Sequence, residues 1–190
     1  MTRAAGDLAP VRLRTESAHE TRALGAALAR GLRPGDVVLL AGELGAGKTT
    51  LAQGIGAGLG VTDQVTSPTF TLVRSYPCPV PPPARPGSER EGDEHGAPPA
   101  VRAFLHADLY RLEHLGEVVD LAIGELVEED AVAVVEWGDV AEPVLGADAL
   151  SVRLAAGPHD DERCVTITAG PSWSPRHAEL TRLLAQWARS

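Results

Sequence analysis

The residues of this chain best suited to chemistry form a glycine-rich run that ends in a lysine and two threonines. The run consists of Gly42, Glu43, Leu44, Gly45, Ala46, Gly47, Lys48, Thr49 and Thr50. Its positions 42–49 match the pattern G-x-x-x-x-G-K-[ST], in which backbone N–H groups surround phosphate oxygens and the lysine contacts them. The run therefore predicts a nucleotide-binding loop.

Lys48 is the only lysine of the chain, and every other Lys or Arg position is an arginine. A compact ammonium on a flexible stem suits the space between nucleotide β- and γ-phosphates better than a planar guanidinium does. An apolar strand at residues 36–41 precedes the loop and a helical pattern at 49–55 follows it, as the motif requires. We therefore expect Lys48 to bind phosphate, Thr49 to bind Mg²⁺ and Thr50 to continue the helix.

Two carboxylates stand where predicted core strands end. Glu136 follows the apolar run 131–135, and Asp108 ends the predicted strand 101–108. In open α/β sheets ligands bind at the carboxyl ends of the strands, so Glu136 could hold the metal ion and Asp108 could orient the attacking water or support the metal. A helix N-cap is an equally good interpretation of Asp108.

Length and charge limit the functional classes. A chain of 190 residues with 44% hydrophobic content predicts one domain over residues 15–190, after a flexible N-terminus at 1–14. The formal net charge of −9 argues against direct, non-specific binding to nucleic acid, so a role on RNA would run through a partner. The sequence shows neither a secretory signal nor an apolar run near the length of a membrane span, and we expect a cytoplasmic protein.

The alternation of strand and helix patterns predicts an α/β fold like that of the P-loop NTPases. We expect a mixed, mostly parallel sheet flanked by helices, extended by an antiparallel hairpin that pairs strand 71–76 with strand 101–108. Between these strands, residues 77–100 are rich in proline and charge, and we predict a disordered insertion there. One helix over 115–126 should bury Val118, Val119, Ala122 and Leu126.

Four segments together resemble a known family. They are GELGAGKTT at 42–50, SPTFTLV at 67–73, HADLYRL at 106–112 and VEW at 135–137. In this order they resemble TsaE, the bacterial ATPase family of tRNA threonylcarbamoyladenosine biosynthesis, over about residues 15–170. The insertion at 77–100 and Ala107, where an aromatic residue is more usual, depart from the family pattern.

The resemblance implies a function and a set of site residues. It implies Mg²⁺-dependent hydrolysis of ATP that supports transfer of a threonylcarbamoyl group to N6 of adenosine 37 in tRNA, with the proteins TsaB and TsaD as partners. It assigns Lys48, Asp108 and Glu136 to catalysis, Thr49 and Glu136 to the metal ion, and Thr69 to sensing of the γ-phosphate. Trp137 would lie beside the nucleotide, although a tryptophan of the core is an equally good interpretation.

Two other functions use the same loop. A small-molecule kinase would pass the γ-phosphoryl group to a metabolite, but it usually brings an arginine-rich lid, and the candidate lid here holds only Arg85 and Arg90. A nucleotide-gated binding module would use ATP to order the loop 67–70 for a partner, with little turnover. A GTPase is disfavoured because its guanine-reading motif needs a second lysine, which the chain lacks.

Overall fold

The structure is a computed structural model, and it describes residues 8–68, 71–79, 100–112, 115–127 and 130–188. Thr69 lies outside the described residues, as do 1–7 of the predicted flexible N-terminus and 80–99 of the predicted insertion. Within the described part, no helix is long and apolar enough to cross a membrane.

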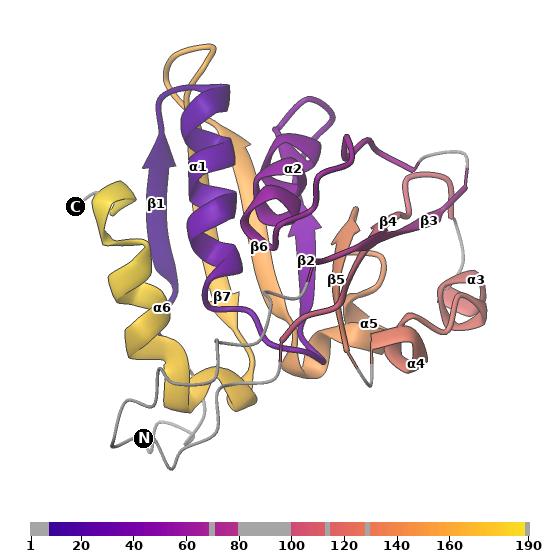
Figure 1. Ribbon diagram of the computed structural model, residues 1–190. Helices are drawn as coiled ribbons and strands as arrows, with labels where there is room; N and C mark the ends of the chain where they lie inside the picture. Colours follow the sequence, from indigo (N-terminus) through magenta and orange to yellow (C-terminus); the bar gives the residue numbers. More distant parts are fainter. Residues whose placement is uncertain (1–7, 69–70, 80–99, 113–114, 128–129, 189–190) are drawn as a thin grey trace, which may run out of the picture.

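The elements follow one another as a strand and helix alternation (Figure 1). The strands are β1 (Val11–Thr15), β2 (Val37–Ala41), β3 (Val73–Pro77), β4 (Ala103–Asp108), β5 (Ala131–Glu136), β6 (Leu150–Ala156) and β7 (Arg163–Ala169). The α-helices are α1 (Ala18–Ala29), α2 (Lys48–Gly58), α3 (Leu115–Asp120), α4 (Ile123–Val127), α5 (Glu142–Leu145) and α6 (His177–Leu183). Three short 3₁₀ helices complete the list: η1 (Gly146–Asp148), η2 (Pro171–Arg176) and η3 (Ala185–Trp187).

The strands form one seven-stranded mixed sheet in the order β1-β7-β6-β2-β5-β4-β3. The central strands β6, β2, β5 and β4 pair in parallel. β1 runs in their direction as well, because it pairs antiparallel with β7, which pairs antiparallel with β6. β3 pairs antiparallel with β4, as expected of the hairpin. The predicted α/β fold with a mixed, mostly parallel sheet is confirmed.

The N-terminal boundary of the ordered part differs from the prediction. We expected residues 1–14 to be flexible, but Val11–Thr15 forms β1 and pairs with β7 over its whole length. Its apolar side chains alternate with polar ones, and Val11 and Leu13 are buried in the core. This period-2 pattern over five residues is short, and the strand owes its position to pairing with a hairpin distant in sequence.

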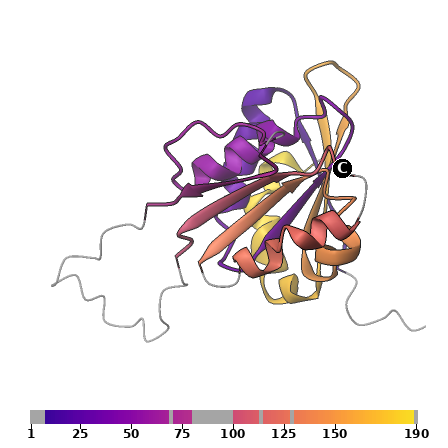
Figure 2. The ribbon, with the colours of Figure 1, turned by 90° about the vertical axis from the view of Figure 1, so that its right-hand side faces the viewer.

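Helices cover both faces of the sheet (Figure 2). On one face α1, α2 and α6 bury a core against the sheet that includes Leu28, Leu51, Ile55 and Leu184. On the other face α3 and α4 bury a smaller core that includes Val118, Ile123 and Val127. β5 is buried along its whole length, as its continuous apolar run predicts for a strand covered on both sides.

Close packing of α1 on α2 fixes the helix that begins at Lys48. A Cβ added at Gly25 would lie 2.4 Å from the carbonyl oxygen of Leu51, and one added at Gly54 would lie 2.2 Å from that of Arg22. Both positions therefore need glycine for the helix backbones to approach. Ser17 is the N-cap of α1, because its hydroxyl accepts the Glu20 N–H at 3.1 Å.

The predicted helix over 115–126 is two short helices instead. The chain breaks at Ala122, which has φ of +46°, so α3 and α4 present different faces. Val118 is buried as expected, but Val119 and Leu126 are exposed, and Ile123 and Val127 are buried in their place. The prediction of one continuous helical face was wrong because the break falls on an alanine, a residue that gives no sign of a positive φ.

Candidate nucleotide and metal site

The glycine-rich loop connects the end of β2 to the start of α2. Gly42 has φ of +143°, and a Cβ there would lie 2.3 Å from the carbonyl oxygen of Leu154 on β6, so only glycine lets the loop leave the sheet. Gly47 precedes α2 with φ of +99° and offers no side chain to cap it. The first N–H groups of an α-helix have no acceptor within the helix, so this end can bind an anion.

Lys48 bends back over its own loop. Its Nζ donates hydrogen bonds to the carbonyl oxygens of Gly42 at 2.7 Å and Glu43 at 2.9 Å, and it lies 3.7 Å from the centroid of the Trp137 ring. The side chain is buried, and this desolvation lowers the pKa of Lys48, against the opposing influence of the carboxylates of Glu136, Asp108 and Asp139. The ammonium is thus held at the loop by weak carbonyl acceptors that a phosphate could replace.

Glu136 meets the loop from β5. Its Oε2 accepts a hydrogen bond from the Thr49 hydroxyl at 2.9 Å, and its Oε1 lies 2.9 Å from Nε2 of His106 on β4. Glu136 and His106 are both buried. A hydroxyl of the phosphate loop and a carboxylate at a strand end therefore lie together, which is the arrangement that holds Mg²⁺ in P-loop NTPases.

Asp108 lies beside Glu136 at the end of the neighbouring strand, because β4 and β5 pair in parallel with these two residues in register. Its Oδ2 accepts a hydrogen bond from the Ser67 hydroxyl, and its Oδ1 accepts the Tyr110 N–H at 3.0 Å. Tyr110 follows in a turn rather than a helix. Asp108 therefore caps a turn and holds the loop at Ser67, in place of the helix N-cap that we considered.

Trp137 leaves β5 in a strained conformation. Its φ is +60°, a value that bulky residues rarely adopt outside functional sites. Its half-buried ring lies over the Lys48 ammonium and packs against Tyr110, with ring centroids 5.0 Å apart. The strained turn thus places an aromatic face at the mouth of the site, and Trp137 is not a residue of the deep core.

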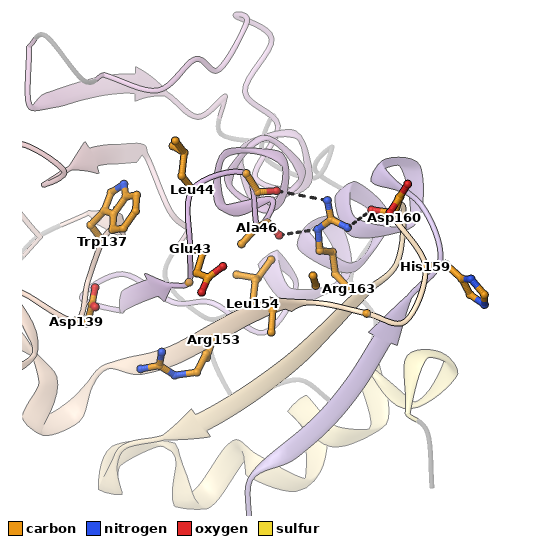
Figure 3. Close-up of a pocket in the computed structure, with 15 residues that line it drawn as sticks. Glu43, Leu44, Ala46, Trp137, Asp139, Arg153, Leu154, His159, Asp160 and Arg163 are labelled. Atoms are coloured by element: carbon orange, nitrogen blue, oxygen red, sulfur yellow. Dashed lines mark hydrogen bonds between the residues drawn. The ribbon is translucent and has the colours of Figure 1, made fainter.

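Two cavities meet at the glycine-rich loop. The smaller, of about 430 Å³, is lined by Lys48, Thr49, Thr50 and Ser67 together with Asp108, Tyr110 and Glu136. The larger, of about 650 Å³, lies between the loop and the β6–β7 hairpin and includes Glu43, Arg153 and Arg163 (Figure 3). Leu44, Gly45 and Trp137 line both cavities, so the two cavities adjoin at the loop.

Arg163 ties the loop to the β6–β7 hairpin. Its Nε donates to the carbonyl oxygen of Ala46 at 3.0 Å and its Nη2 to that of Gly45 at 3.4 Å, while its Nη1 donates to carbonyl oxygens of Asp160 and Glu162. Figure 3 shows the guanidinium between the loop and the turn of the hairpin. One side chain thus fixes two successive carbonyls of the phosphate loop from outside.

The comparisons with known proteins agree with this geometry. The family model "Threonylcarbamoyl adenosine biosynthesis protein TsaE" matches residues 15–165. The chain belongs to the TsaE family. It is 44% identical over 158 residues to the tRNA threonylcarbamoyladenosine biosynthesis protein TsaE of Streptomyces coelicolor, covering 80% of this chain and 93% of that protein.

A second relative and a solved structure extend the match. The TsaE protein of Bacillus subtilis is 36% identical over 171 residues, which cover 89% of this chain and 92% of the relative. The crystal structure of YdiB from Bacillus subtilis aligns with a TM-score of 0.64 and 31% sequence identity, over 94% of this chain and 95% of that chain. The fold of this TsaE family member is therefore shared along nearly its whole length.

Most of the predicted site residues of this TsaE family member lie around the two adjoining cavities. Lys48, Thr49, Asp108, Glu136 and Trp137 come together there, with the loop residues 42–47. Thr69 lies outside the described residues, although Ser67, two positions before it, bonds to Asp108 in the site. Tyr110 and Arg163 line these cavities although no sequence pattern predicted a role for them, and His106 was predicted only as part of the segment HADLYRL.

The donor set suits a magnesium ion. Thr49 Oγ1 and the Glu136 carboxylate are hard oxygen donors in hydrogen-bonding contact, and Mg²⁺ in nucleotide sites is held by one or two such ligands together with phosphate oxygens and water. The described residues contain no group of three or more His, Cys, Asp or Glu side chains arranged to hold a metal ion. A magnesium ion here would therefore rely on the phosphates of a nucleotide.

Proposed function

We propose that this protein is a Mg²⁺-dependent ATPase that supports N6-threonylcarbamoylation of adenosine 37 in tRNA, acting on a complex of the partner proteins TsaB and TsaD. The observation that carries the proposal is the hydrogen bond from Thr49 Oγ1 to Glu136 Oε2, which joins the phosphate loop to the strand-end carboxylate. The pathway, tRNA threonylcarbamoyladenosine biosynthesis, is that of the relatives, which the chain matches along most of their length.

The two adjoining cavities support a placement of ATP across the loop. The triphosphate end would lie in the smaller cavity, where Lys48, Thr49 and both carboxylates are. The nucleoside would extend into the larger cavity of about 650 Å³ beside β6, which is lined in part by residues 154–157. Adenine is the better guess than guanine, because the chain lacks the lysine of the guanine-reading motif.

Each residue of the site has a part in this proposal. Lys48 exchanges its carbonyl acceptors for phosphate oxygens, and the N–H groups at the start of α2 bind the same phosphates. Thr49 and Glu136 would hold Mg²⁺, which when bound neutralises charge on the phosphates. Asp108 lies across from Glu136 and orients the attacking water, while Trp137 covers the Lys48 side of the smaller cavity.

Charge supports a role through partners. With a net charge of −9 the chain lacks the basic surface that dominates affinity for nucleic acid, and the residues of the smaller cavity serve phosphate chemistry. The contact of Ser67 with Asp108 ties the loop 66–68 to the nucleotide site. A change at the phosphates can therefore move this loop, which favours coupling of ATP hydrolysis to a partner.

A reconstitution tests the proposal. ATP hydrolysis and modified adenosine are measured with TsaB, TsaD, tRNA and the threonylcarbamoyl donor, with and without this chain. We expect hydrolysis to need both Mg²⁺ and this chain, and repeated rounds of tRNA modification to need that hydrolysis. Repeated modification while this chain hydrolyses no ATP would refute the ATPase role, and submicromolar tRNA binding by the isolated chain at physiological salt would refute the indirect role.

A further inference from the structure

The buried imidazole of His106 has no role in the function proposed above. His106 lies on β4 one pleat before Asp108, and its side chain has no exposed surface. Its Nε2 lies 2.9 Å from Oε1 of Glu136 on the neighbouring strand. A polar side chain that is wholly buried usually has hydrogen-bond partners for its polar atoms, so the burial of His106 needs an explanation.

The hydrogen-bonding pattern gives the imidazole a direction. An ionised carboxylate only accepts hydrogen bonds, so Nε2 carries the hydrogen and donates it to Glu136. Among the described residues Nδ1 has no hydrogen-bond partner, although it is fully buried. An apolar side chain would avoid this unsatisfied atom, so His106 costs stability for the sake of the one bond that it makes to the site.

The ring is also held in orientation. It stacks on Phe104, with centroids 6.0 Å apart and planes 21° apart, and Phe104 is itself wholly buried. The partner Glu136 divides its two oxygens: Oε1 contacts His106 and Oε2 accepts the Thr49 hydroxyl. A donor fixed in the core therefore sets the rotation of the carboxylate and aims its other oxygen at the phosphate loop.

We propose that His106 is a positioning residue that holds the Glu136 carboxylate in the orientation needed to bind Mg²⁺ with the nucleotide. The inference rests on the proposed Mg²⁺-nucleotide site and deepens it. Groups that fix the ligands of a metal typically change metal affinity about 10- to 100-fold when they are lost. His106 touches neither nucleotide nor metal in this assignment and acts only through Glu136.

Two amide variants provide a matched test. The longer side chain of His106→Gln can place an N–H where the imidazole has Nε2, whereas the shorter one of His106→Asn places it near Nδ1, out of reach of Glu136. Both bring the same polar group into the same pocket, so general damage to the core affects them alike. The unmodified chain and both variants are titrated with Mg²⁺ at fixed ADP in a calorimeter, and ADP binding without Mg²⁺ and the melting temperature are measured alongside.

We expect His106→Asn to need at least about 10-fold more Mg²⁺ for half-maximal binding and His106→Gln to stay within about 3-fold of the unmodified protein. ADP binding without Mg²⁺ should be equal in all three. Equal Mg²⁺ requirements in Gln and Asn, with the unmodified protein dependent on Mg²⁺, would overturn the role of His106 alone. Absence of any Mg²⁺ effect in the unmodified protein would overturn the proposed metal site and this inference together.

The test remains decisive if the asparagine variant folds poorly. His106→Leu removes both the donor and the unsatisfied Nδ1 and keeps an apolar side chain in the core, so it provides a second variant without the donor, in which we expect the weakened Mg²⁺ response. A folded leucine variant with an unchanged Mg²⁺ requirement would also overturn the proposal.

Discussion

The two sides of the phosphate loop are built differently. On the β5–β4 side, the Glu136 carboxylate accepts the Thr49 hydroxyl, Asp108 lies in register beside it, and the charges of both carboxylates act on Lys48. On the β6–β7 side, the Leu154 carbonyl lies so close to the loop that Gly42 has no room for a Cβ, and the guanidinium of Arg163 donates to the loop carbonyls of Ala46 and Gly45. One side carries groups for chemistry, and the other holds the shape of the loop.

The residues proposed to act on phosphate and metal and the residues that hold the loop in shape therefore lie on different sides of the loop. The chemical side uses charged groups that are buried, as Lys48, Asp108 and Glu136 are. Buried charges act strongly because the surroundings screen them little. The supporting side uses hydrogen bonds from Arg163 to backbone carbonyls, which fix the shape of the loop. We therefore expect changes on the chemical side to alter turnover and changes on the supporting side to alter affinity.

The largest effect should come from Lys48, which belongs to both sides because its Nζ contacts the loop carbonyls and lies near the carboxylates. Lys48→Ala should weaken Mg²⁺-ATP binding by about 100-fold or more, since two charge-assisted hydrogen bonds are worth roughly 3 kcal/mol or more together. Lys48→Arg should also be severely impaired, because the planar fork does not fit the loop. Calorimetric titration with ATP measures both, and normal binding and turnover by the arginine variant would contradict the assignment.

On the chemical side, Glu136→Gln should slow hydrolysis on the order of 100-fold while nucleotide affinity changes little, because it removes a charge at the metal with almost no change in volume. The Thr49 hydroxyl can still bond to the amide, so the fold should persist. Partner-stimulated ATPase assays and ADP titration separate the two quantities.

Asp108→Asn is the matched carboxylate variant for that experiment. An asparagine can still accept the Tyr110 N–H and bond to Ser67, so we expect slower hydrolysis with an intact turn. If both variants hydrolyse ATP at the normal rate with partners present, the chemical side has been assigned to the wrong residues.

On the supporting side, Arg163→Gln should weaken nucleotide binding by roughly 10-fold, because the loop loses hydrogen bonds at Ala46 and Gly45 that are each worth about 1 kcal/mol. The rate of hydrolysis at saturating ATP should stay close to normal. Arg12→Gln, an exposed arginine of β1, removes the same charge away from the loop and serves as the control. A loss of saturated turnover in Arg163→Gln, with affinity unchanged, would remove the distinction between the two sides.

The same difference explains what the sequence could predict. The residues of the chemical side could be predicted from short sequence patterns. Phosphate binding requires the spacing seen in 42–49, and metal binding requires acidic residues at the ends of apolar strands. The parallel pairing that puts Asp108 beside Glu136 follows from the α/β alternation. Thr69 and the roles of the individual carboxylates stay predictions.

The supporting side has no local pattern. Arg163 reaches the loop across more than a hundred positions of sequence, and an arginine after a hairpin turn is indistinguishable from a solvated surface residue. β1 escaped prediction because its partner strand lies at the other end of the chain. The break at Ala122 escaped because an alanine gives no sign of a positive φ. These features depend on contacts that only the folded chain brings together.

The smallest effect should follow from shortening the insertion, because it connects β3 to the start of β4, and Asp108 stands at the opposite end of that strand. Residues 81–99 contain few apolar side chains, and closing a long loop adds to the entropy cost only slowly with its length. The strands at its ends are already paired, since the Cys78 N–H donates to the Arg102 carbonyl at 2.8 Å beyond the ladder of β3 and β4.

A short Gly-Ser turn in place of 81–99 should therefore join the hairpin with little strain. The melting temperature, Mg²⁺-ADP affinity and partner-stimulated ATPase should all stay near those of the full chain, because the deletion leaves Asp108 and Glu136 on strands that remain paired. A drop in melting temperature would show that the segment packs on the fold. A loss of partner stimulation alone, with stability and nucleotide affinity unchanged, would contradict this prediction and mark residues 81–99 as a segment that contacts a partner.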